Sequence, residues 1–88
     1  MVEAYPAIFH CEEDGYWVEF PDLPGCLSEG EDTAQAISQA SAALGGYLCS
    51  LMDRGMELPQ PGRIQSLHTE GDDFVSMVAA DPLAFKQR

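Results

Sequence analysis

Strand-forming and polar residues alternate around a turn signal near the start of the chain. In EAYPAIFHCEEDGYWVEF, residues 3–20, residues with strand propensity flank Asp14-Gly15, a dipeptide that accepts positive φ at both central positions of a type I′ turn. This predicts a hairpin in which position 9 faces 20, 11 faces 18 and 13 faces 16. Strand alternation then defines two sides. The core side holds Phe9, Cys11, Val18 and Phe20, and the other side holds His10, Glu12, Trp17 and Glu19.

Prolines and glycines mark a reversal directly after the hairpin, in FPDLPGCLSEGEDT, residues 20–33. The segment 23–26, LPGC, fits a type II turn, because proline fixes a negative φ and the following glycine accepts a positive one. Residues 26–30 can then run back as a short third strand. Asp32 is a suitable helix N-cap, with Gln35 three residues later.

Apolar residues recur every three or four positions from Thr33 to about Arg54, which predicts a helix with one buried stripe. Gly55 supplies the signal that ends the helix. The adjacent glycines at positions 45 and 46 weaken a helix, so we expect either close packing against the sheet or a kink there. The predicted stripe is Ile37, Ala40, Leu44, Leu48, Leu51 and Met52.

One more strand follows the helix. The segment ELPQPG cannot continue a helix, and a turn at residues 70–73 precedes FVSMVAA, which predicts a strand over residues 74–80. The order β-β-β-α-β predicts an α+β fold, a small antiparallel hairpin-based sheet of three to four strands covered by one helix. The predicted core is Phe9, Cys11, Val18, Phe20, Ile37, Leu44, Leu48 and Val75 or its neighbours.

Composition adds a strong charge asymmetry to this picture. The 88-residue chain has room for one small core, and 15 acidic against 4 basic residues give a net charge of −11. Residues 1–53 contain no Lys or Arg. Such a surface repels phosphate backbones and favours cationic partners, so we expect no direct nucleic-acid binding by this chain. The alternative is a charged surface that serves only solubility.

Cysteine usage and hydropathy indicate a cytoplasmic protein. The three cysteines are widely separated, form no CxxC pair and follow no apolar signal peptide, so we expect reduced core thiols. No run approaches the ~20 apolar residues of a membrane span.

Candidate chemistry is weak in this sequence. A two-metal nuclease would need several converging carboxylates, but no spacing singles out a set among the acids of residues 12–29. His10 lies opposite Glu19 in the predicted hairpin, which favours a cross-strand ion pair over a general base. Cys26 follows a turn glycine and is more plausible as a small strand residue than as a reactive thiol. We therefore assign no catalytic, cofactor-binding or metal-binding residue.

A family resemblance rests on YPAIFHCEEDGYWVEFPDLPGCLSEGEDTAQAISQASAALGGYL followed by MELPQP, about two-thirds of the chain. Its specific part is the hairpin with an aromatic second strand, then F-P-D-L-P-G-C, S-x-G-x-[DT], a helix and a proline-containing exit. This combination resembles the N-terminal domain of HicB antitoxins. The resemblance implies a partial ribonuclease-H-like fold that lacks the catalytic metal carboxylates of true ribonucleases H.

The resemblance also implies a non-enzymatic function. HicB antitoxins bind and mask the HicA toxin, a small basic ribonuclease of double-stranded-RNA-binding fold that cleaves messenger RNA using a histidine. Residues 1–80 would then be a HicB-like toxin-binding domain, and residues 81–88 a C-terminal stub or the start of a missing segment. The family usually continues into a DNA-binding segment, whereas this sequence stops at FKQR.

The expected partner is a basic HicA-like toxin, and we expect a homo-oligomer. Trp17 lies with acids on the side of the hairpin opposite the predicted core, and an exposed Trp is a frequent interface anchor. The candidate partner-binding residues are Trp17, Glu19, Asp22 and Glu29. Two alternatives stay open: a metal-dependent nuclease of ribonuclease-H-like fold, and a stand-alone protein-binding domain with another partner.

Overall fold

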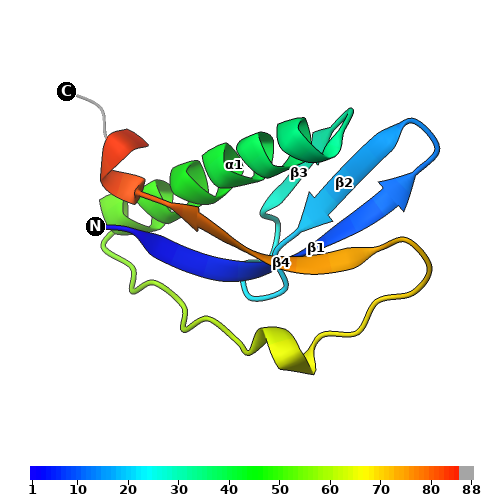
Figure 1. The fold of residues 1–88 in the computed structure, drawn as a ribbon. Coiled ribbons are helices and arrows are strands. Elements are labelled where there is room, and N and C mark those ends of the chain that lie inside the picture. Colours follow the sequence, from blue (N-terminus) through cyan, green and yellow to red (C-terminus); the bar gives the residue numbers. More distant parts are fainter. Residues whose placement is uncertain (86–88) are drawn as a thin grey trace.

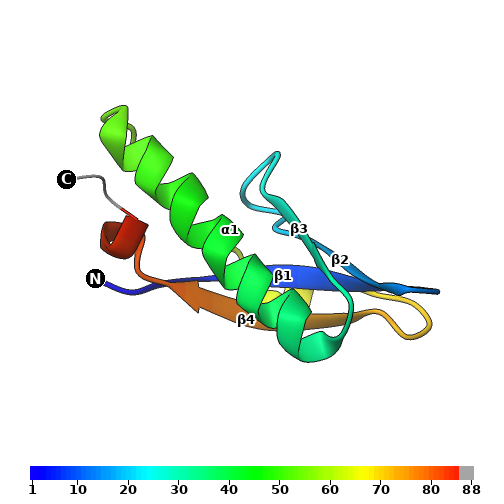
Figure 2. The same cartoon turned by 90° about the horizontal axis from the view of Figure 1, so that it is seen from above.

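The computed structural model describes residues 1–85 and shows one antiparallel sheet with a long helix packed on one face (Figures 1 and 2). The sheet order is β3-β2-β1-β4, and every neighbouring pair is antiparallel. This confirms the predicted α+β class. Residues 86–88 of the predicted stub lie outside the described residues. The elements are β1 (Glu3–Glu12), β2 (Gly15–Glu19), β3 (Leu27–Gly30), α1 (Thr33–Asp53), η1 (Ile64–Ser66), β4 (Phe74–Ala80) and η2 (Pro82–Phe85).

The β1–β2 hairpin has the predicted sides but not the predicted register. Phe9 pairs with Val18, not with residue 20, so the partners are shifted by two residues. The type I′ prediction is also wrong, because no described non-glycine residue has a positive φ and residues 13–14 form the turn. Gly15 instead begins β2 with a φ of 148°, where a Cβ would collide with the backbone of Gly30 on β3. A two-residue shift keeps each side chain on its predicted side of the ribbon.

Local capping signals place both ends of α1. The Gln35 N–H donates to Asp32 Oδ1 over 2.8 Å, which confirms Asp32 as the N-cap. At the other end Gly55 has a φ of 70°, and its N–H donates to the Met52 carbonyl. The Met56 N–H donates to the Leu51 carbonyl, which completes a Schellman motif. Gly25, with a φ of 84°, forms the predicted turn before β3.

The core lies between α1 and the sheet face that α1 covers. Two predicted members are wrong. Cys11 is exposed because the tip of the hairpin projects beyond α1 (Figure 2), and Ile37 is 45% exposed because it lies at the border of the helical stripe. On β4 the predicted Val75 is only half-buried, but its neighbour Phe74 packs against the core, and Val78 and Ala80 are buried in it. The most completely buried large side chains are Tyr5, Phe9, Val18, Leu23, Leu44 and Leu48.

Gly45 and Gly46 lie inside an unbroken α1, and close packing rather than a kink explains the first of them. A Cβ at Gly45 would collide with the ring of Phe85 on η2, whereas a Cβ at Gly46 would meet open space. The absence of a side chain at position 45 therefore lets η2 dock directly on the helix. The sequence-based expectation of packing against the sheet named the wrong neighbour.

The opposite face of the sheet, called the outer face below, is not covered by α1. The segment 54–73, called the connection, runs along this side of the sheet (Figure 1). Hydrogen bonds tie it down along its length: the Tyr5 hydroxyl donates to the Pro59 carbonyl over 2.5 Å, the Gly62 N–H donates to Asp22 Oδ2 over 2.8 Å, and the Cys11 N–H donates to Asp73 Oδ1 over 2.8 Å. The part of the outer face formed by β2 and β3 stays accessible.

Candidate functional site

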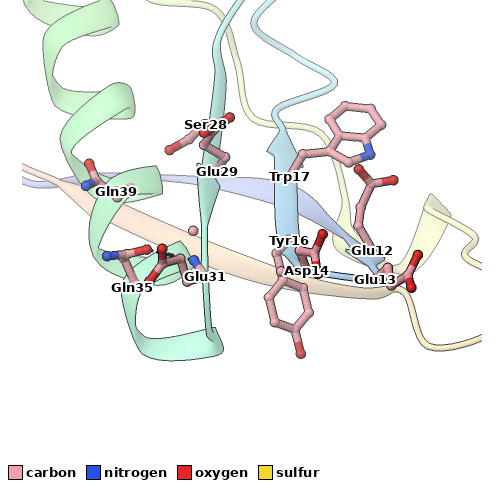
Figure 3. Close-up of a pocket in the computed structure, with 12 residues that line it drawn as sticks. Glu12, Glu13, Asp14, Tyr16, Trp17, Ser28, Glu29, Glu31, Gln35 and Gln39 are labelled. Carbon is pink, nitrogen blue, oxygen red and sulfur yellow. Dashed lines mark hydrogen bonds between the residues drawn. The ribbon is translucent and has the colours of Figure 1, made fainter.

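Three of the four predicted partner-binding residues lie together on the accessible part of the outer face. Trp17 on β2 pairs with Glu29 on β3. Glu19 pairs with Leu27, which is two residues before Glu29 on β3 and therefore on the same face. Trp17 is 36% exposed and Leu27 is 60% exposed, so two large apolar side chains are open to solvent beside carboxylates. Glu12 lies beside Trp17 (Figure 3). We call this group the Trp17 patch: Glu12, Trp17, Glu19, Leu27 and Glu29.

His10 supports the patch from β1. Its ring stacks on Trp17, with ring centroids 4.0 Å apart and planes 12° apart. Its Nε2 contacts Glu19 Oε2 at 2.5 Å, so the two residues predicted to pair do meet, although the register places Trp17 rather than Glu19 directly opposite His10. Its Nδ1 contacts Asp73 Oδ2 at 3.0 Å. Hydrogen bonds from the Cys11 N–H and from His10 lower the pKa of Asp73.

Asp22, the fourth predicted residue, is not part of this patch. Its carboxylate accepts the hydrogen bond from Gly62 of the connection, and it lies in the loop between β2 and β3. Its contact is thus structural. Leu27 was not among the candidates. Pairing the predicted third strand with the second strand would have placed it beside Glu19. Asp73 was missed because it is 63 positions from His10.

An open hollow of about 750 Å³ adjoins the patch at the tip of the hairpin (Figure 3). Five carboxylates line it, together with Tyr16 and Trp17 from β2 and Gln35 and Gln39 from α1. In Figure 3 the acidic side chains come from three different segments and do not point at one centre. The five acids are Glu12, Glu13, Asp14, Glu29 and Glu31.

The acids do not form a metal site in residues 1–85. No three His, Cys, Asp or Glu side chains in this range are placed so that they could hold one ion. The metal-dependent nuclease alternative therefore has no ligand set in the described part of the chain. Within the same range, no helix combines the length and the apolar character that crossing a bilayer requires.

The cysteines differ in their surroundings. All three thiols are free. Cys26 is buried, and this burial raises the pKa of its thiol to about 11, so the thiol stays protonated and is a poor nucleophile. This agrees with the interpretation of Cys26 as a small packing residue. Cys11 is exposed, which corrects the expectation that all three are core thiols.

Sequence comparisons identify relatives over most of the chain. The family model of HicB-like antitoxins of bacterial toxin-antitoxin systems matches residues 5–88. Antitoxin HicB 2 of Photorhabdus laumondii subsp. laumondii is 32% identical over 76 residues, which cover 86% of this chain and 50% of that protein. An uncharacterized 14.9 kDa protein of Haemophilus phage HP1 is 32% identical over 76 residues, covering 84% of this chain and 57% of that protein. The chain spans about half the length of these two relatives.

Solved structures share the fold. A chain of a toxin-antitoxin complex from Streptococcus pneumoniae has a TM-score of 0.89 and 29% identity, covering 97% of this chain and 73% of that chain. A chain of the HicA3 and HicB3 toxin-antitoxin complex has a TM-score of 0.73 and 24% identity, covering 91% of this chain and all of that chain. The family match over residues 5–88 and the 32% identity to an antitoxin show that this chain belongs to the HicB-like antitoxin family.

Proposed function

We propose that this chain neutralises a small basic ribonuclease toxin of the HicA type by binding it through the Trp17 patch. The role is one of binding without catalysis, it is exercised in the cytoplasm, and residues 1–80 carry it. Two of the solved relatives are chains of toxin-antitoxin complexes, one of which names HicA3 as a component. These relatives support a toxin as the class of partner.

The observation that carries the proposal is the pairing of exposed apolar side chains with carboxylates on one face. Trp17 and Leu27 are exposed on neighbouring strands, and Glu12, Glu19 and Glu29 surround them. Interfaces commonly place an aromatic anchor at the centre and charged groups around it. No Lys or Arg occurs in residues 1–53, which include all of this surface.

Charge explains how such a surface would act on a ribonuclease. A ribonuclease uses cationic side chains to hold the phosphates of its RNA substrate. The carboxylates of the Trp17 patch offer the same cations an alternative partner, and the net charge of −11 speeds the encounter of the two proteins. The apolar contacts of Trp17 and Leu27 then slow dissociation. Bound toxin would be kept from its messenger RNA.

Co-expression in bacteria tests the proposal. The small basic protein encoded beside this chain is induced alone, with the wild-type chain, or with a double variant, Trp17→Ala with Glu29→Gln. We expect the wild-type chain to restore growth and to co-purify with a catalytically inactive form of the toxin, and the double variant to do neither.

A matched control separates the site from general damage. The double variant Ile37→Ala with Glu57→Gln also truncates one exposed apolar side chain and neutralises one exposed carboxylate, but both residues lie outside the Trp17 patch. It should rescue growth like the wild type. Failure of the wild-type chain to rescue growth would refute the function, whereas equal rescue by both double variants would refute only the site.

A further inference from the structure

His10 lies where three parts of the molecule meet. Its ring stacks on Trp17 of β2, and its two nitrogens contact Glu19 of β2 and Asp73, the last residue of the connection before β4. The side chain of His10 is only 23% exposed, so its ring lies under the accessible surface rather than on it. It therefore does not offer a large contact area of its own to a partner.

The contacts hold the His10 ring in one orientation. Both ring nitrogens meet a carboxylate oxygen, Nε2 that of Glu19 and Nδ1 that of Asp73. Rotation of the ring would break both contacts. Asp73 is itself anchored, because the Cys11 N–H donates to its Oδ1 over 2.8 Å. The backbone of β1 thus holds the Asp73 carboxylate through the Cys11 N–H, and this carboxylate in turn holds the His10 ring through Nδ1.

This ordering passes on to Trp17. The imidazole plane lies within 12° of the indole plane, with the ring centroids 4.0 Å apart, so the His10 ring covers one face of the indole. Trp17 is still 36% exposed, so part of it remains available for contact. A side chain that is already ordered loses less conformational entropy when a partner binds.

We infer that His10 is a positioning residue that fixes the Trp17 indole for partner binding, and that Asp73 holds His10 in place for this purpose. The inference rests on the proposed function, because it deepens the role of the same patch. The inference also gives the connection a role in partner binding, because Asp73 is its last residue before β4 and contacts His10.

Fluorescence of the isolated chain tests the positioning without any partner. Trp17 is the single tryptophan, so its signal needs no deconvolution. We expect His10→Ala to raise acrylamide quenching of Trp17 about twofold, to lower its anisotropy and to weaken its near-UV circular dichroism, because the indole loses its stacked neighbour. His10→Phe retains a stacking ring and should restore most of the signal. Gln65→Ala, at an exposed position of the connection, is the control and should change nothing.

Asp73→Asn provides a second route to the same result if His10→Ala does not fold. Its amide oxygen can still accept from the Cys11 N–H, but it loses the negative charge that holds His10. We expect the quenching of Trp17 in this variant to lie between that of the wild type and that of His10→Ala. Quenching and circular dichroism of Trp17 that stay unchanged in the folded His10→Ala and Asp73→Asn variants would overturn the inference.

Titration with the catalytically inactive toxin completes the test. We expect His10→Ala to raise the dissociation constant about tenfold and His10→Phe to raise it much less, because the ordering of Trp17 must then accompany binding. If the wild type binds and His10→Ala binds equally well, the positioning role is wrong while the proposed function stands. If the wild type itself does not bind, the proposed function fails and the inference falls with it.

Discussion

The two faces of the sheet use the same strands for different purposes. On the face under α1, Phe9 and Val18 are fully buried, and no polar or charged side chain is buried among the described residues. On the outer face, their sequence neighbours His10 and Trp17 are partly exposed and stack on each other, and His10 also contacts the carboxylates of Glu19 and Asp73. Because side chains alternate along a strand, a step of one residue along the chain moves from the covered face to the outer face, which we propose binds the partner. Stability and binding should therefore respond to different substitutions.

The largest effect is expected on the covered face. Leu44→Ala should lower the free energy of unfolding by about 2–5 kcal/mol, because it removes buried methyl groups and leaves a cavity in the core. Ile37→Ala, on the same helix but 45% exposed, should cost far less. Urea melts followed by circular dichroism measure both. A loss below about 0.5 kcal/mol for Leu44→Ala would mean that the buried face of α1 is wrongly described.

Thiol labelling sharpens the contrast between covered and open positions. With a pKa of about 11, roughly 0.1% of the Cys26 thiol is ionised at pH 8, and its burial also blocks reagents. We expect iodoacetamide to modify Cys11 first in the folded chain and Cys26 only after unfolding, as read by peptide mass spectrometry. Equal labelling rates in the native state would contradict the assigned core.

Ionic strength separates the contribution of the carboxylates of the Trp17 patch to the proposed binding from that of its apolar side chains. We expect the affinity for the inactive toxin to fall several-fold as salt is raised, because screening is strong beyond the Debye length of ~10 Å at 0.1 M. Glu29→Gln should make this dependence shallower, whereas Glu57→Gln, outside the patch, should change it less. A salt-independent affinity would argue that carboxylates do not contribute to binding.

The smallest effect concerns the acid stability of the outer face. The pKa of Asp73 in the folded chain lies below its ordinary value of 3.8, chiefly because it accepts from the Cys11 N–H. A carboxyl whose pKa is lower in the folded than in the unfolded chain stabilises the fold at pH values above the unfolded pKa. This stabilisation is lost as the pH falls from 3.8 through the pKa of the folded chain. Asp73→Asn should therefore show a weaker loss of stability in this range, measured by urea melts at several pH values. Identical slopes for both chains would contradict the Asp73 contacts.

Local signals in the sequence predicted most of the fold. Alternation placed Phe9 and Trp17 on their correct sides, and Asp32 and Gly55 correctly marked the ends of α1. The hairpin register failed because Gly15, which resembles a turn residue, is required where β2 passes the backbone of β3. That requirement comes from a strand that follows later in the chain.

The candidate site could be predicted only in part, for a similar reason. Trp17, Glu19 and Glu29 share a face because of strand alternation, which is a local property. The bonds of Asp22 to Gly62 and of His10 to Asp73 join segments 40 and 63 positions apart, and no local pattern encodes such pairs. The residues that organise the patch were therefore harder to predict than the residues exposed on it.

Calorimetric titration of the catalytically inactive toxin into three forms of the chain tests the central claim most directly. The forms are the wild type, Trp17→Ala and Ile37→Ala, which differ in whether the lost apolar surface lies on the outer face or on α1. We predict that Trp17→Ala weakens binding by about 2 kcal/mol, or roughly thirtyfold, as expected for an interface anchor, while Ile37→Ala stays within about twofold of the wild type. Equal affinities for Trp17→Ala and the wild type would contradict the assignment of the outer face as the toxin-binding surface.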